Sequence, residues 1–154
     1  MDCGECTLCC KLLEIRSLPK KAGTWCEYCE IDRGCKIHDT DIPEECSKFS
    51  CAYRQMKKVS LNLRPDKCGV IFERFDDIFI GTVDPNINGF SDDLKGQIYS
   101  FLREGFSIVL FNQRIQKPVI YTSKNHTAKE VWEKIKEIRK KRENKWQPQV
   151  TQQI

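Results

Sequence analysis

The stretch Cys3–Cys10, CGECTLCC, spaces four cysteines as C-x-x-C-x-x-C-C. A second group of soft ligands follows: Cys26, Cys29, Cys35, His38, Cys46 and Cys51. Apolar residues between these positions are few and scattered, so the segment could hardly fold by hydrophobic burial alone. Metal binding would supply the missing free energy. We therefore predict a cysteine-rich, metal-stabilised N-terminal module over residues 1–54.

The spacing of these residues is typical of metal ligands. In a C-x-x-C pair a tight turn aims both sulfurs at one ion, and Cys26 with Cys29 is such a pair. Zinc and iron–sulfur clusters both accept thiolate ligands. The first three cysteines match the start of a bacterial ferredoxin run, but Cys10 follows Cys9 directly and no x-x-x-C-P comes after it. The sequence thus leaves zinc or iron, including an iron–sulfur cluster, open as the cofactor.

The residue pattern also bears on the cellular setting. The N-terminus lacks a basic n-region, an apolar h-region and a cleavage site, so we expect no secretory signal and a cytoplasmic location. Clustered cysteines in a reducing compartment are more often metal ligands than disulfides. A disulfide scaffold and a thioredoxin-like role for Cys26 and Cys29 are the weaker alternatives. No apolar run is long enough to span a bilayer, and we expect no membrane partner.

Charge is unevenly distributed along the chain. Residues 1–51 carry seven basic and ten acidic side chains, a net charge of −3, and bound thiolates would add to it. An acidic module argues against a zinc finger that binds nucleic acid, which normally presents a basic face. Residues 129–145 carry eight basic and four acidic side chains, a net charge of +4. That basic C-terminal helix could bind a protein partner, although a solvated helix face is the simpler interpretation.

The remainder of the chain predicts a small α+β region over residues 55–146, followed by a frayed tail at 147–154. Alternating and β-branched runs predict four strands, at Cys68–Phe75, Ile78–Val83, Phe106–Asn112 and Pro118–Thr122. Ser91 predicts the N-cap of one helix, which Gly105 ends. A capping box at Thr127 and Glu130 starts another. We expect an α+β fold, in which the cysteine-rich module packs on a small, mainly antiparallel sheet with two helices.

Recognisable catalytic patterns are missing from the sequence. There is no P-loop, dinucleotide fingerprint or Ser/His/Asp pattern. Cys68 is read as a small buried core residue and His126 as structural. The favoured hypothesis is therefore a metal-binding protein whose metal mainly organises the fold. Two alternatives stay open: an iron–sulfur-dependent enzyme that modifies protein side chains, and an interaction protein that uses the basic C-terminal helix.

Four segments together carry a family resemblance: CGECTLCCK (residues 3–11), WCEYC (25–29), GCKIHDTDIPEEC (34–46) and FSC (49–51). In this order they resemble the CxxCxxCC family of zinc- or iron-chelating proteins. The same module is similar to that of the flagellin lysine methylases. The resemblance covers residues 3–52 and extends weakly to LRPDKCGVIFE, residues 63–73.

The resemblance implies a set of metal ligands by position. The main ligands it implies are Cys3, Cys6, Cys9, Cys10, Cys35 and Cys46. It implies accessory candidates at Cys26, Cys29 and Cys51. This chain departs from the family pattern at one place, where an Arg-Pro pair is replaced by Ile42-Pro43. The turn is retained and the arginine is lost, so a role for that arginine is not expected here.

Overall fold

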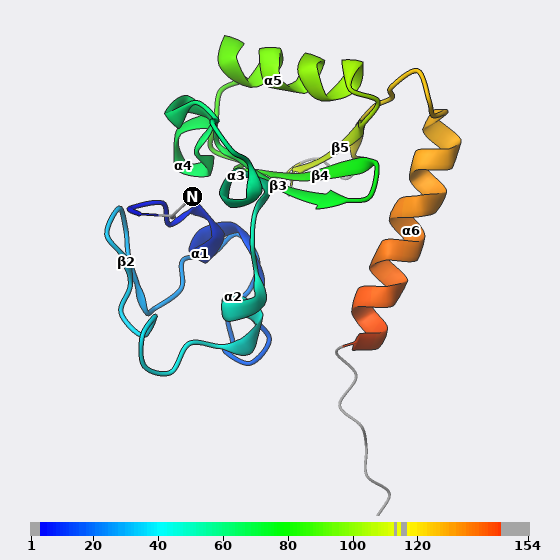
Figure 1. The fold of residues 1–154 in the computed structure, drawn as a ribbon. Helices are drawn as coiled ribbons and strands as arrows, with labels where there is room; N and C mark the ends of the chain where they lie inside the picture. Colours follow the sequence, from blue (N-terminus) through cyan, green and yellow to red (C-terminus); the bar gives the residue numbers. More distant parts are fainter. Residues whose placement is uncertain (1–3, 113, 115–116, 146–154) are drawn as a thin grey trace, which may run out of the picture.

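The computed structural model describes residues 4–112, 114 and 117–145. Within these residues the chain is an α+β protein with six α-helices, one 3-10 helix and two sheets (Figure 1). The N-terminal part contains α1 (Leu8–Leu12), β1 (Cys29–Glu30), β2 (Gly34–Cys35), α2 (Glu44–Lys48), α3 (Ala52–Gln55), η1 (Leu61–Leu63) and α4 (Pro65–Cys68). The remainder contains β3 (Val70–Phe75), β4 (Ile78–Val83), α5 (Asp92–Arg103), β5 (Ser107–Asn112), β6 (Val119–Tyr121) and α6 (Ala128–Lys145). The α+β class expected from the sequence is confirmed.

The main sheet has the strand order β3-β4-β5-β6 and is mixed. Strands β3 and β4 pair antiparallel, as do β5 and β6, whereas β4 and β5 run parallel. The parallel pair arises because α5 carries the chain from the end of β4 back to the end of the sheet where β4 began, in the manner of a crossover connection. Two of the three pairings are antiparallel, and the mixed topology is the finding that the sequence did not predict.

Helix α5 covers one face of this sheet with an aromatic core (Figure 1). Phe101 stacks on Phe79 of β4, with ring centroids 4.1 Å apart. Phe72 of β3 meets both rings edge-on, at 6.4 and 6.2 Å. Such offset and edge-to-face pairs stabilise a core beyond the area that they bury. Leu94 and Ile98, on the same side of α5, complete the contact.

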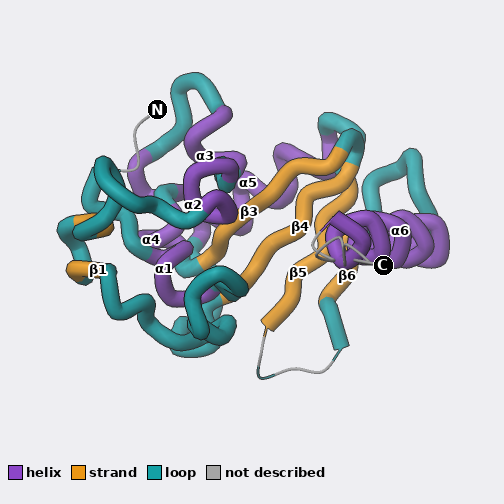
Figure 2. Tube along the Cα trace, turned by 90° about the horizontal axis from the view of Figure 1, so that it is seen from below, coloured by secondary structure: helices purple, strands orange, loops and turns teal. Residues whose placement is uncertain are grey.

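The opposite face of the sheet is shared by two different parts of the chain (Figures 1 and 2). Helix α6 buries Val131 and Ile135 against the middle strands, where Ile80 is a contact residue. Helix α1 buries Leu12 against Ile71 of β3. The cysteine-rich segment therefore docks on the edge of the sheet through apolar side chains, with α6 beside it on the same face.

Most predicted element ends agree with the structure. Ser91 caps α5 by accepting a hydrogen bond from the Leu94 amide at 3.3 Å. The capping box is present, since the Glu130 amide donates to Thr127 Oγ1 at 3.3 Å and Glu130 Oε2 accepts from the Thr127 amide at 2.7 Å. The predicted frayed tail at 147–154 lies outside the described residues. None of the helices in the described part of the chain is both long and apolar enough to cross a bilayer.

One strand begins two residues later than predicted. Cys68 ends α4, and Gly69 follows in the left-handed region with φ of 72°. A Cβ atom at Gly69 would lie 2.3 Å from Cγ2 of Ile87, so the close approach as well as the φ angle favours glycine. Strand β3 therefore starts at Val70. Cys68 itself is buried in the α5 core, as the sequence predicted.

Candidate metal centre

Helix α1 carries the two adjacent cysteines, Cys9 and Cys10. Leu8 and Leu12 lie one turn apart and are both buried in the apolar cluster that contains Ile71. Successive helical residues are rotated by about 100°. Cys9 packs against the same apolar cluster, and Cys10 is not among the residues packed against it. The vicinal pair thus links the core of the molecule to the loops beyond α1.

The C-x-x-C segment at Cys26 and Cys29 folds back over Cys10. The Cys26 amide donates to the Cys10 carbonyl oxygen at 3.0 Å, and the Cys29 amide donates to the Cys26 carbonyl oxygen at 3.1 Å. The tight turn expected of the C-x-x-C spacing is present. The neighbouring side chains of Cys9 and Cys29 both raise the pKa of the Cys10 thiol. Two segments far apart in the sequence therefore bring three thiols into contact.

The hairpin β1–β2 and helix α2 add two further cysteines to this group. Cys35 lies directly opposite Cys29 in the antiparallel ladder, which places both side chains on one face of the hairpin. Cys46 lies in α2, and its pKa is raised first by burial and then by negative charge on Cys9, Cys26 and Cys35. We refer to the six residues together as the cysteine cluster: Cys9, Cys10, Cys26, Cys29, Cys35 and Cys46. All six are free thiols.

Contact and burial shift the pKa values of four thiols of the cluster. The hydrogen bond from Cys10 lowers the pKa of Cys9, and the same contact raises the pKa of Cys10. Burial raises the pKa of Cys29 and raises that of Cys46 to about 11. Thiolates are the form that binds metals, so a metal entering this cluster would displace protons.

A buried lysine lies at the end of the helix that carries Cys9 and Cys10. Lys20 is only 8% exposed, and its ammonium group donates to the carbonyl oxygens of Lys11, at 3.1 Å, and Leu13. Those carbonyls belong to the C-terminal end of α1, the helix that carries Cys9 and Cys10. Burial lowers the pKa of Lys20, while the neighbouring thiolates act in the opposite sense.

The structure places Cys6 apart from the cluster. Its thiol donates to the carboxylate of Asp66 in α4, and burial raises the pKa of Cys6 to about 12. Arg64 donates two hydrogen bonds to the same carboxylate, at 2.7 and 2.9 Å. Burial alone would raise the pKa of Asp66, but the bonds from Arg64 and Cys6 hold it below its ordinary value. Cys6 thus joins the N-terminal loop to the segment that leads into β3.

The other predicted ligands lie in three different environments. His38 is exposed, at 69%, and its Nδ1 lies 2.8 Å from Oδ1 of Asp39. Cys51 is buried in the apolar cluster beneath α1. Cys3 lies outside the described residues. Within the part of the chain that is described, no set of three or more cysteine, histidine, aspartate or glutamate side chains could hold a metal ion as it stands.

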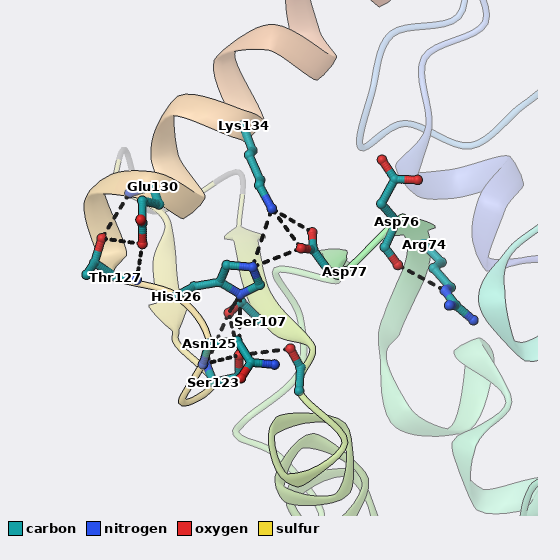
Figure 3. A network of polar contacts seen from close by, with 11 residues as sticks. Arg74, Asp76, Asp77, Ser107, Ser123, Asn125, His126, Thr127, Glu130 and Lys134 are labelled. Carbon is teal, nitrogen blue, oxygen red and sulfur yellow. Dashed lines mark hydrogen bonds and ion pairs between the residues drawn. The ribbon is translucent and has the colours of Figure 1, made fainter.

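A second polar network lies at the start of α6 (Figure 3). His126 Nδ1 is 2.9 Å from Ser107 Oγ, and His126 Nε2 is 2.9 Å from Oδ2 of Asp77. Lys134 of α6 also donates to Asp77, at 2.7 and 2.9 Å. Ser123 Oγ lies 3.3 Å from His126 Nδ1 and donates to the Gly105 carbonyl at 2.9 Å. The order serine, histidine, aspartate is that of a hydrolase triad.

The burial of the serine assigns this network a structural role. Ser107 is 0% exposed and Ser123 is 5% exposed, so neither hydroxyl can meet a substrate in this conformation. The Ser107 hydroxyl accepts a hydrogen bond from the Ser123 amide at 3.0 Å. Together these bonds fasten the β3–β4 turn, the start of β5 and the start of α6 to one another. The structural interpretation of His126 agrees with this geometry.

Four residues in and around the candidate site were missed by sequence reasoning. Lys20 lies in the charged stretch PKKAG, where nothing distinguishes an inward lysine from a solvated one. Thr7 is 2% exposed and hydrogen bonds to Cys29, which gives it a positioning role. Asp66 and its partner Arg64 follow the cysteine-rich segment, within residues 63–73, to which the resemblance extends only weakly.

Comparisons with protein-family models, with curated proteins and with solved structures give no significant match for this chain. The case for a function therefore rests on the chemistry and the placement of these side chains.

Proposed function

We propose that this chain is a metal-binding protein that holds zinc or an iron–sulfur cluster through its clustered cysteines. The ligands come from the six residues of the cysteine cluster, and the metal mainly organises the N-terminal module. The observation that carries this proposal is the hydrogen bond from the Cys26 amide to the Cys10 carbonyl oxygen at 3.0 Å, which brings the C-x-x-C turn to α1, beside Cys9 and Cys10. It joins two segments that lie far apart in the sequence.

The donor set fits this proposal chemically. Thiolates are preferred ligands of zinc and of iron–sulfur clusters, and four of them complete either kind of site. Six free thiols from α1, the C-x-x-C turn, the hairpin and α2 offer more than that number. Binding would require the side chains to converge further than they do in the present arrangement. It would also displace protons, which makes metal affinity pH-dependent.

A structural role for the metal is supported by the weak packing of the module. Helices α1 and α2 have five residues each, and strands β1 and β2 have two each. Helix α2 has no buried residue. Elements this short are not stable on their own, and a metal that ties them together contributes folding free energy directly.

The experiment is purification of the chain without oxygen, followed by metal analysis and visible absorption spectroscopy. A colourless protein with stoichiometric zinc would identify a zinc site, and a brown protein that bleaches in air would identify an iron–sulfur cluster. The proposal fails if the folded protein retains neither metal and binds neither on reconstitution.

Two matched variants sharpen this experiment. Cys10→Ser removes the thiol that joins two segments, and we expect it to lose metal. Cys68→Ala removes a thiol that is buried in the α5 core and hydrogen bonds to the Leu63 and Val70 carbonyls. It should retain the metal despite some loss of stability. Equal metal content in the two variants would contradict the assignment of the cluster.

A further inference from the structure

Lys20 is the one lysine of its loop that turns inward. Its neighbour Lys21 is exposed, whereas Lys20 is buried and reaches the C-terminal end of α1. Two backbone hydrogen bonds hold the bend of this loop. The Ile15 amide donates to the Lys20 carbonyl at 3.1 Å, and the Lys20 amide donates to the Leu18 carbonyl at 2.6 Å. A bridge between Ile15 and Lys20 thus fixes the backbone from which the ammonium group extends.

Two hydrogen bonds orient the ammonium group but do not neutralise it. Its acceptors are the neutral carbonyl oxygens of Lys11 and Leu13. Four thiols of the cysteine cluster raise the pKa of Lys20 by electrostatic attraction: Cys10, Cys26, Cys9 and Cys46. These thiols come from α1, the C-x-x-C turn and α2. Lys20 is therefore a buried cation fixed at the C-terminal end of α1, the helix that carries Cys9 and Cys10.

We propose that Lys20 is the charge-compensating residue of the metal centre, whose fixed ammonium group offsets the negative charge of the bound thiolates. This inference rests on the proposed function. A divalent ion held by four thiolates carries a net charge of −2, which is costly to bury. A cation fixed at short range reduces that cost, because electrostatic attraction is strong where water is excluded. Groups beyond the ligands commonly change metal affinity by about 10- to 100-fold.

The test compares three full-length variants with the wild-type chain, each prepared metal-free under reducing conditions. Lys20→Gln removes the charge and retains an N–H donor for the carbonyls of α1. Lys20→Arg retains the charge. Lys21→Met makes the same change of net charge at an exposed neighbouring position. Circular dichroism of each metal-free chain reports whether the fold is kept.

The probe is Co²⁺ alone, which reports thiolate ligation through its sulfur-to-metal charge-transfer band, followed by Zn²⁺ in competition. We expect Lys20→Gln to weaken binding by about 10- to 100-fold. Its charge-transfer band should also move to longer wavelength, because loss of a nearby cation raises the energy of the sulfur electrons. Lys20→Arg should restore both properties, and Lys21→Met should match the wild type.

The outcomes separate the inference from the proposed function. If the wild type binds metal and Lys20→Gln matches it in affinity and band position, the role of Lys20 is refuted and the metal centre stands. The role of Lys20 is also refuted, and the metal centre stands, if Lys20→Arg has the same weakened affinity and shifted band as Lys20→Gln. If the chain holds an iron–sulfur cluster, Lys20→Gln should make its reduction potential more negative, and an unchanged potential refutes the inference. A wild type that binds no metal refutes both proposals.

Discussion

The ammonium nitrogen of Lys11 lies 2.7 Å from Oδ2 of Asp84, and both side chains are nearly buried, at 13% and 11% exposed. Lys11 ends the CGECTLCCK segment, and Asp84 follows β4. Asp84 also accepts a hydrogen bond from the Asn86 amide at 3.0 Å. This ion pair ties the cysteine-rich module to the sheet by a polar contact, in addition to the apolar contact at Ile71.

We expect Lys11→Met to destabilise the protein by about 3 kcal/mol, because it leaves a largely buried carboxylate without its cation. Lys95→Met is the control, since Lys95 pairs with Asp92 at the surface and the side chains are 54% and 99% exposed. Such an exposed pair is worth less than about 1 kcal/mol. Urea denaturation measures both free energies of unfolding. Equal values for the two variants would show that the buried pair does not anchor the module.

A glycine in the sheet provides a test of the aromatic core. A Cβ atom at Gly81 would lie 2.5 Å from Cδ2 of Leu110 and 3.0 Å from Cε1 of Phe72. Gly81→Ala should therefore overpack the α5 face and destabilise the protein by about 1–3 kcal/mol. Gly96→Ala in α5 meets no atom within 4 Å and should stabilise it by about 0.5–1 kcal/mol. Thermal unfolding should give shifts of opposite sign, and a stabilising Gly81→Ala would contradict the packing described.

The polar network at α6 predicts a pH dependence of stability. The hydrogen bond from Lys134, with a further one from His126, holds the pKa of Asp77 below its ordinary value. In the unfolded chain this pKa is about 3.9. Because the folded pKa is the lower one, the stabilisation is complete above the unfolded pKa and is lost as the pH falls through the folded pKa.

Melting temperatures measured between pH 6 and pH 2, a range of about four units around that value, test this dependence. Asp77→Asn should lower the melting temperature at pH 6. It should also reduce the fall in melting temperature between pH 6 and pH 2. Lys134→Met should flatten it too, since it removes the main cause of the pKa shift. The network has no such role if both variants retain the wild-type decline.

A further prediction separates Cys6 from the cysteine cluster. Because Cys6 donates to Asp66, Cys6→Ser preserves a donor at this place and should retain more metal than Cys10→Ser. The measurement is metal content per folded chain after dialysis. If Cys6→Ser loses metal as completely as Cys10→Ser does, Cys6 is itself a ligand, as the family resemblance implies.

The regular elements were predictable because their signals are local. Periodicity and caps specify α5 from Ser91, and the capping box specifies the start of α6. The parallel pairing of β4 and β5 is not local, since it depends on which strand end α5 returns to. Gly69 shortened a predicted strand through its contact with Ile87, which lies 18 positions along the chain.

In the candidate site, too, local features could be predicted from the sequence and contacts between distant residues could not. The C-x-x-C turn at Cys26 follows from its spacing alone. Spacing cannot specify partners: it did not indicate that Cys10 meets Cys29, that Cys6 meets Asp66, or that His38 faces solvent. Those contacts are set by tertiary packing between α1, the loops and the sheet.

The most direct test of the metal centre is X-ray absorption spectroscopy of the chain loaded with its metal. For zinc, we predict a first coordination shell dominated by sulfur at about 2.3 Å. An iron–sulfur cluster would show sulfur neighbours and a second shell of iron. A shell of oxygen and nitrogen without sulfur would contradict the account, because it would place the metal away from the cysteine cluster.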